Sequence, residues 1–262
     1  MKKKWTGERL ETFVYNDTTV EHLHRYGIVM HFIENKTVLD IACGEGYGSK
    51  LIAGKASTVY GVDIDPVTIK NAKQKYAAPN LSFLEGSADN IPLKASTVDV
   101  VVSFETIEHH DKHEEMMNEI KRVLKPGGIL IMSSPEKKSE VSFNEFHVKE
   151  LSRTEFIKLI NQSFRFSKFY SQKIAFGSVI APIENATGSN FEFEYGGFEH
   201  INSYPEIPDH VFNLCIASDE PGISLPISIF DGRDILVENI LRPYHNSRLY
   251  RSVGFIKKLF HL

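Results

Sequence analysis

The stretch VLDIACGEGYGS, residues 38–49, constrains this chain of 262 residues more than any other segment. It begins as a short apolar run that contains Asp40, and it continues with glycine at every second position: Gly44, Gly46 and Gly48. A strand that passes through a glycine turn into a helix lets the backbone approach a bound cofactor closely. The stretch therefore predicts a buried strand, a tight turn and a helix, with a ligand held at the turn.

The spacing of the glycines argues against a dinucleotide. A dinucleotide-binding turn follows G-x-G-x-x-G, and counted from Gly44 the last glycine position is taken by Ser49. Asp40 precedes Gly44 by four residues, where an acid suits a cationic amino group better than a pyrophosphate. Asp63 ends the next apolar run, 19 residues after Gly44, and can accept hydrogen bonds from both hydroxyls of a ribose. A ribose and a positively charged amino acid end together describe S-adenosylmethionine.

Short apolar runs alternate with amphipathic segments between about residues 38 and 135. Strand, helix, strand at this spacing predicts a parallel sheet with right-handed crossovers. We expect a Rossmann-like, doubly wound α/β fold with a mostly parallel seven-stranded sheet and an insertion before the last strand. The expected strands are 37–42, 58–64, 81–86, 97–105, 128–135, 164–172 and 210–218.

Three parts of the chain are expected. Residues 1–37 would form an N-terminal cap or lid, and residues 219–262 a C-terminal extension. Residues 38–218 would form the cofactor-binding domain, with an insertion at about 177–210 that covers the acceptor. That insertion is too long for a simple connection, which favours a functional cover.

Composition excludes several classes of protein. A net charge of −4 gives no reason to expect a nucleic-acid partner. Two cysteines cannot form a disulfide framework, and the N-terminal lysines are not followed by the apolar run of a secretory signal, so we expect a cytoplasmic protein. The tail 248–262 is basic and apolar. It either docks on its own domain or makes a peripheral contact with a membrane or a protein partner.

Four ordered motifs carry a resemblance to a known family. VLDIACGEGYGS, YGVDIDP, VDVVVSFETIEHH and EIKRVLKPGGILIMSSP together resemble the class I S-adenosylmethionine-dependent methyltransferases, over roughly residues 25–175. TGER, EHLHRY and FHVKEL also resemble methyltransferases of polysaccharide and O-antigen assembly. The resemblance implies an enzyme that uses S-adenosylmethionine as its cofactor.

The resemblance also implies how parts of the cofactor are held. Arg25 would bind the carboxylate of the cofactor, unless it is a surface arginine. Ser87 replaces the aspartate with which the family often grips the adenine, so Asp89 either substitutes for it or is solvated. Phe104 would line the cleft or serve as a core aromatic. The cofactor-binding positions predicted from residues and resemblance together are Arg25, Asp40, Ala42, Gly44, Gly46, Asp63, Ile64, Ser87, Ala88, Asp89 and Phe104.

Methyl transfer to a hydroxyl requires removal of a proton, and histidine is the natural base near neutral pH. His147 follows the fifth strand and is the first candidate; His109 follows the fourth strand and is the second, unless it only ties the loop down. The acidic and histidine-rich stretch 105–113 has no recognised metal-ligand spacing. We therefore expect no metal there and interpret it as a solvated charged face.

The acceptor is the least constrained element. Aromatic residues among glycines at 191–204 suit a sugar face, or else form an edge hairpin packed on the core. Together with the resemblance to glycan assembly, they favour O-methylation of a sugar or glycan-related acceptor. The alternatives are a small-molecule or quinone-like methyltransferase, and a cofactor-binding scaffold of a glycan-assembly complex without catalytic activity.

Overall fold

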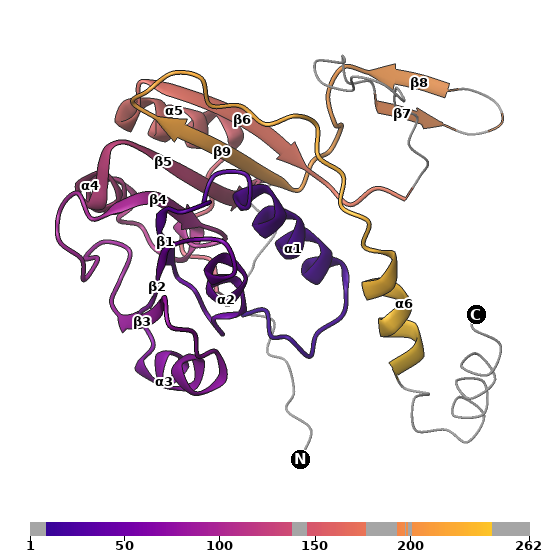
Figure 1. Ribbon diagram of the computed structural model, residues 1–262. Helices are drawn as coiled ribbons and strands as arrows, with labels where there is room; N and C mark the ends of the chain where they lie inside the picture. Colours follow the sequence, from indigo (N-terminus) through magenta and orange to yellow (C-terminus); the bar gives the residue numbers. More distant parts are fainter. Residues whose placement is uncertain (1–8, 138–145, 177–192, 197, 199–200, 243–262) are drawn as a thin grey trace, which may run out of the picture.

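The computed structural model describes residues 9–137, 146–176, 193–196, 198 and 201–242. A seven-stranded sheet with the order β3-β2-β1-β4-β5-β9-β6 forms its centre (Figure 1). All neighbours from β3 to β5 pair in parallel, whereas β9 runs antiparallel to both β5 and β6. The strands are β1 (Thr37–Ile41), β2 (Thr58–Asp63), β3 (Leu81–Glu85), β4 (Val98–Ser103), β5 (Leu124–Pro135), β6 (Phe166–Gln172) and β9 (Phe212–Ser218). The predicted fold class is confirmed.

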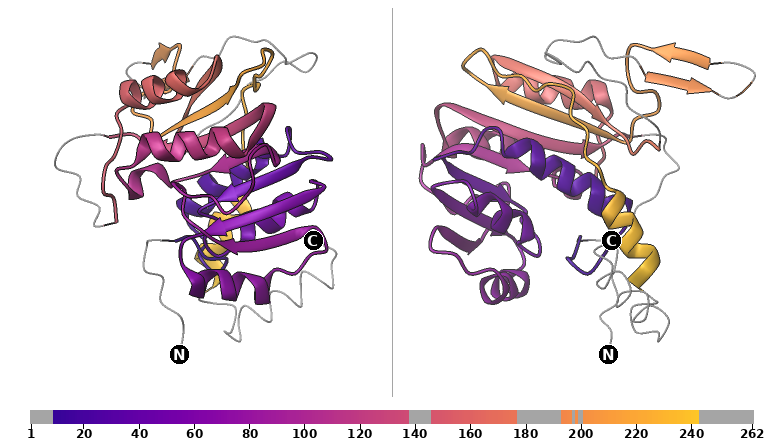
Figure 2. Two further views of the ribbon diagram at one scale, coloured as in Figure 1. Left: turned by 90° about the vertical axis from the view of Figure 1, so that its left-hand side faces the viewer. Right: turned by 45° about the vertical axis from the view of Figure 1, so that its right-hand side comes forward.

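Helices cover both faces of the sheet (Figure 2). Tyr26 and Val29 of α1 and Ile52 of α2 pack with alternate residues of β1 and β4 on one face. Met116 and Met117 of α4 pack with α5 on the other face. The described helices are α1 (Asp17–Val29), α2 (Tyr47–Ala53), α3 (Pro66–Lys75), α4 (His113–Val123), α5 (Arg153–Ser163) and α6 (Arg233–Leu241), with a short 3-10 helix at Ile107–His109.

The order of the strands decides where a ligand can bind. β1 lies between β2 and β4, and the chain crosses from β2 and β3 on one side of β1 to β4 and β5 on its other side. At such a switch point, the connections that leave the carboxyl ends of neighbouring strands run to opposite sides of the sheet. A crevice forms between them. The loops that follow β1, β2, β3 and β4 all open into this crevice.

A long connection joins β6 to β9, as the expected insertion requires. It carries a two-stranded antiparallel hairpin, β7 (Phe193–Gly196) and β8 (Ile201–Tyr204). The hairpin stands apart from the main sheet in every view, and Phe198 and Ile201 are exposed (Figures 1 and 2). The alternative expectation, a hairpin packed on the core, is therefore wrong for these exposed residues.

Two further expectations concern the cysteines and membrane-spanning segments. Cys43 and Cys215 are both buried free thiols, so they form no disulfide. Within the part of the chain that the structure describes, no helix has the length and apolarity needed to cross a membrane. The basic apolar tail 248–262 lies outside the described residues.

Candidate cofactor and acceptor site

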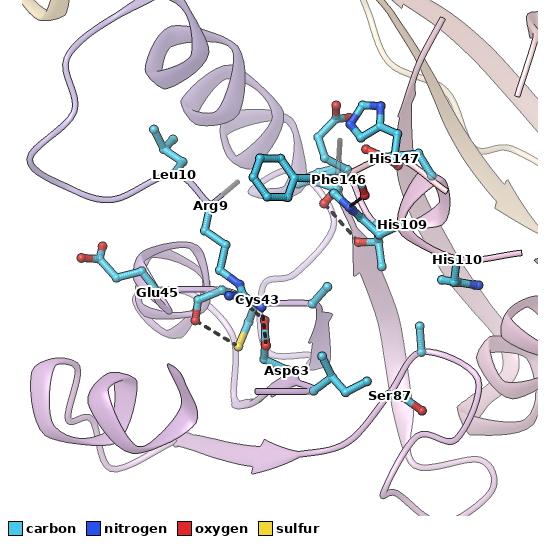
Figure 3. A pocket seen from close by; sticks show the side chains of 18 of the residues that line it. Arg9, Leu10, Cys43, Glu45, Asp63, Ser87, His109, His110, Phe146 and His147 are labelled. Carbon is cyan, nitrogen blue, oxygen red and sulfur yellow. Dashed lines mark hydrogen bonds and ion pairs between the residues drawn. The ribbon is translucent and has the colours of Figure 1, made fainter. Parts of the chain in front are cut away.

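A cleft of about 640 Å³ lies at the carboxyl ends of β1, β2 and β4. Arg9 and Leu10 close it from the segment that precedes α1 (Figure 3). One end of the cleft is formed by the glycine turn and the loops after β2 and β3, and the other end by the loop after β4 together with Phe146 and His147. Of the predicted cofactor positions, those that line it are Ala42, Gly44, Asp63, Ile64, Ser87, Ala88, Asp89 and Phe104.

The glycine turn needs left-handed backbone. Ala42, Gly44 and Gly46 have φ values of 56°, 54° and 93°. A side chain is disfavoured at such positions, and at Gly46 a Cβ would also lie 2.7 Å from the ring of Phe83. Gly46 is the N-cap of α2 and does not line the cleft, so its role is to let the chain turn rather than to contact a ligand.

Asp63 fixes this turn from the neighbouring strand. Its Oδ2 accepts a 2.9 Å hydrogen bond from the backbone N–H of Gly44, and its Oδ1 accepts one of 3.0 Å from Asp65. Each carboxylate oxygen has a second lone pair, so Asp63 can still accept from a ligand in the cleft. This is the arrangement expected of a residue that binds two ribose hydroxyls.

Arg9 lies over the same carboxylate and was not among the predicted residues. Its Nη2 is 3.7 Å from Oδ1 of Asp63, and its Nη1 is 3.7 Å from Oδ2 of Asp65. Figure 3 shows its side chain extending from the N-terminal segment toward Asp63. The motif TGER, which ends in Arg9, was the signal available in the sequence, but its target lies 54 residues further along the chain.

Asp40 is not placed as predicted. It is 1% exposed, lies outside the cleft lining, and accepts a 2.6 Å hydrogen bond from Ser49 and one of 3.3 Å from Tyr26. Burial raises the pKa of Asp40 to about 7, against the opposing effect of these two hydrogen bonds. Because side chains alternate along a strand, Asp40 points beneath α1 and α2 together with Val38 and does not line the cleft, so its contact with a cationic amino group stays a prediction.

Arg25 is not the surface arginine of the second alternative. It is fully buried, so it is no surface residue, and it does not line the cleft. Its Nε donates a 2.7 Å hydrogen bond to Gln172, its Nη1 lies 3.2 Å from Oε1 of Glu105, and its guanidinium stacks 4.1 Å from the ring centroid of Phe212. These contacts link α1 to β6 and β9, while neither Nη atom of Arg25 has a hydrogen bond to a described residue. A contact of Arg25 with the cofactor carboxylate stays a prediction.

The loops after β3 and β4 form the far side of the glycine end. Ser87 donates a hydrogen bond to Asp89, and Lys112 donates one of 2.6 Å to the other carboxylate oxygen. Hydrogen bonding from Lys112 and Ser87 lowers the pKa of Asp89 to about 2. Asp89 is therefore a charged acceptor in the cleft, and its contact with an adenine amino group stays a prediction.

Phe104 satisfies both predicted alternatives. It is 7% exposed, and its ring packs edge-on against Tyr26 at a centroid distance of 5.3 Å, as a core aromatic does. It also lines the cleft between the glycine end and the histidines. Phe104 thus marks the boundary between the two ends of the cleft.

Both predicted histidines line the other end of the cleft. The rings of His109 and His147 lie edge to face, 5.3 Å apart, and Figure 3 shows them beside Phe146. Glu108 stands next to them and is 1% exposed. The expectation of a solvated charged face is therefore wrong for Glu108, which the 3-10 helix turns inward.

The described part of the aromatic insertion does not contribute to this cleft. None of the described residues between 193 and 204 lines it. Tyr47 and His22 do line it, and their Oη and Nδ1 atoms are 2.9 Å apart. Burial lowers the pKa of His22 to about 3, so this imidazole stays neutral. The aromatic contribution to the described site thus comes from Tyr47, Phe104 and Phe146.

The comparisons with known proteins agree with this architecture. A family model described as "Methyltransferase domain" matches residues 39–132. An S-adenosylmethionine-dependent methyltransferase of Mycolicibacterium smegmatis is 35% identical over 140 residues, which cover 52% of this chain and 54% of that protein. A fatty-acid O-methyltransferase of the same organism is 25% identical over 130 residues, covering 46% and 47%. The chain spans about half the length of these curated relatives.

Solved structures share the fold. An S-adenosylmethionine-dependent methyltransferase from Thermotoga maritima superposes with a TM-score of 0.54 and 17% identity, over 77% of this chain and 90% of that one. At this level of identity the similarity concerns the fold alone. The match covers the Rossmann-like sheet that positions the cleft.

Proposed function

We propose that this protein is a class I S-adenosylmethionine-dependent methyltransferase that transfers a methyl group to a hydroxyl oxygen of a polar acceptor. The match of residues 39–132 to the methyltransferase domain model supports the methyl transfer. One observation carries the proposal: a single cleft joins the glycine turn and Asp63 at one end to His109 and His147 at the other. A cofactor and an acceptor bound in it would lie end to end.

The residues at the glycine end fit the cofactor. Gly44 leaves open space above the turn, since a Cβ there would meet only the Arg9 side chain, at 3.9 Å. Asp63 offers acceptors for a ribose, Ile64 and Ala88 offer apolar surface, and Asp89 offers a charged acceptor. When bound, the cofactor supplies a methyl group on a positively charged sulfur, which needs only alignment with a nucleophile.

The residues at the other end fit a hydroxyl acceptor. Nδ1 of His147 lies 2.5 Å from Oε1 of Glu150, which orients the ring in the way a carboxylate orients a catalytic imidazole. We assign proton removal to His147 first and to His109 second. A base contributes typically about 10²–10⁴-fold to such a reaction.

The lining favours a polar acceptor, a sugar hydroxyl above all. Glu105, Glu108, Asp111 and Lys112 line the same cleft as the two histidines, and a bare acyl chain would remove water from these polar groups without offering them hydrogen bonds. A fatty acid is the second candidate, because it is the acceptor named for one relative. The contribution of the 177–210 insertion and of the tail as acceptor or membrane contacts stays a proposal.

The test is transfer of a labelled methyl group to a panel of acceptors: sugars, fatty acids, phenols and amines. We expect transfer to a sugar hydroxyl, and a His147→Ala variant with kcat lower by about 10²–10⁴-fold and nearly unchanged cofactor affinity. His31→Ala, which removes an exposed imidazole, is the matched control. Transfer to amines alone, indifferent to both histidines, would overturn the hydroxyl proposal.

A further inference from the structure

Three side chains at the acceptor end form a compact cluster. Glu108, His109 and His147 each present one potential ligand atom, and these atoms all lie within 4.8 Å of one another. All three residues line the cleft, and the two imidazoles are seen close together at its upper end in Figure 3. Three ligand atoms at such distances can share one bound cation.

The carboxylate of Glu108 lacks a partner among the described residues. Neither of its oxygens has a hydrogen bond, although the residue is 1% exposed. A buried carboxylate without partners costs several kcal/mol, and nearly all buried polar groups avoid this by pairing. A bound cation would supply the missing partner.

Both imidazoles are held as metal ligands usually are. Nδ1 of His109 donates a 2.8 Å hydrogen bond to the carbonyl oxygen of Phe146, and Nδ1 of His147 is bonded to Glu150. Hydrogen bonds from one ring nitrogen to a carbonyl or a carboxylate fix the tautomer and direct the lone pair of Nε2 at a metal. These two hydrogen bonds also distinguish the cluster from side chains that lie close together by chance.

The backbone fixes the distance between the two halves of the cluster. The carbonyl oxygen of Glu108 accepts hydrogen bonds of 2.8 Å from Val148 and 3.0 Å from Lys149. The loop after β4 is thereby tied to the segment that carries His147 and Glu150. The three ligand residues come from two distant parts of the chain, and these two backbone hydrogen bonds hold the two parts together.

We propose that Glu108, His109 and His147 bind one divalent transition-metal ion. Two imidazole nitrogens and one carboxylate suit Zn²⁺, Mn²⁺, Fe²⁺ or Co²⁺ better than Mg²⁺ or Ca²⁺, which prefer oxygen ligands throughout. Three protein ligands leave coordination positions open, as in catalytic rather than structural sites. All three residues line the cleft, so an ion held by them would be within reach of an acceptor bound there.

This inference rests on the proposed function and refines it. An acceptor hydroxyl that coordinates the metal becomes more acidic, because the metal stabilises the alkoxide. Its O–H bond breaks with the electron pair left on oxygen, and the proton leaves to water. His147 then assists as a ligand rather than as the proton acceptor itself.

Metal binding is measured on the full chain, freed of metal by a chelator, by titration with Co²⁺ in the visible spectrum and with Mn²⁺ and Zn²⁺ by calorimetry. We expect one ion per chain. Glu108→Gln keeps the shape of the side chain and should weaken binding at least tenfold, and Glu150→Gln about 10–100-fold. His31→Ala should bind as the natural protein does. No binding at millimolar metal, or unchanged binding by Glu108→Gln, would overturn the proposal.

A second measurement separates this inference from the proposed function. Turnover of the metal-free protein should fall at least tenfold and return when Mn²⁺ or Zn²⁺ is added, while its affinity for S-adenosylmethionine changes less than threefold. Full turnover without metal would overturn the metal inference and leave methyl transfer intact. One bound ion, lost in Glu108→Gln, with no acceptor methylated would support the metal site and count against the proposed function.

Discussion

The hydroxyl of Ser49, on α2, donates a 2.6 Å hydrogen bond to Oδ2 of Asp40, on β1. Tyr26, on α1, donates to the same carboxylate from 3.3 Å. Asp40 and Ser49 both belong to the segment 38–49 that contains the glycine turn, yet they meet on the side of the sheet that α1 and α2 cover. Asp40 therefore joins three elements beneath the glycine turn and does not line the cleft above it.

The first prediction concerns the dependence of stability on pH. The pKa of Asp40 is about 7 in the folded protein and near its ordinary value of 3.8 when unfolded. The stability that Asp40 contributes is complete below pH 3.8 and is lost as the pH rises through 7. Between these two values the folded state holds the proton and the unfolded state has released it, so a rise in pH favours unfolding. Asp40→Asn cannot ionise, so its free energy of unfolding should rise relative to the natural protein by up to about 4 kcal/mol between pH 4 and pH 8.

Urea unfolding of both proteins across this pH range measures the difference. A variant whose relative stability is the same at pH 4 and pH 8 would show that Asp40 ionises normally in the folded state.

The second prediction contrasts two helical glycines. A Cβ at Gly48 would lie 2.0 Å from the ring of Tyr26, whereas one at Gly27 would meet nothing within 4 Å. Gly48→Ala should destabilise the protein by roughly 1–3 kcal/mol through overpacking. Gly27→Ala should stabilise it by about 0.5–1 kcal/mol, because alanine favours a helix. Thermal unfolding should show shifts of opposite sign; a stable Gly48→Ala variant would contradict the close packing of α1 on α2.

The third prediction concerns cofactor affinity. Asp63→Asn removes a charge and acceptors from the cleft and should weaken binding of S-adenosylmethionine by about 1–3 kcal/mol, or roughly 5–150-fold. Asp99→Asn is the matched control, because Asp99 also accepts a backbone hydrogen bond, 2.8 Å from Thr37, and lies outside the cleft lining. Calorimetry measures both. Equal affinities of the two variants would count against a ribose contact by Asp63.

The fourth prediction separates the two roles considered for Arg25. Arg25→Met leaves Glu105 and Gln172 without their partner and should cost about 3–5 kcal/mol of unfolding free energy. Addition of Glu105→Gln should recover part of this loss. The folded fraction should bind S-adenosylmethionine with affinity within threefold of normal, measured by calorimetry at low temperature. A large drop in affinity with little loss of stability would restore Arg25 as a ligand of the cofactor.

Local pattern determined much of this protein. The strand, glycine turn and helix of residues 38–49, the position of Asp63 at a strand end and the seven expected strands all depend on neighbours in sequence, through backbone preference and alternation of side chains. Asp63, Ile64 and Ser87 line the cleft because carboxyl ends of parallel strands meet at one edge.

Tertiary structure decided what those patterns leave open. Alternation shows that Asp40 and Leu39 face opposite sides of the sheet, but only the packing of α1 and α2 covers the side of Asp40. The contacts of Arg25 could not be predicted, because its partners Glu105 and Gln172 lie 80 and 147 residues away. The burial of Glu108 was not predicted either; its carbonyl oxygen accepts hydrogen bonds from Val148 and Lys149, which lie 40 and 41 residues further along the chain. Burial and pairing of charges are long-range properties, since the atoms that remove water from a side chain come from distant parts of the chain.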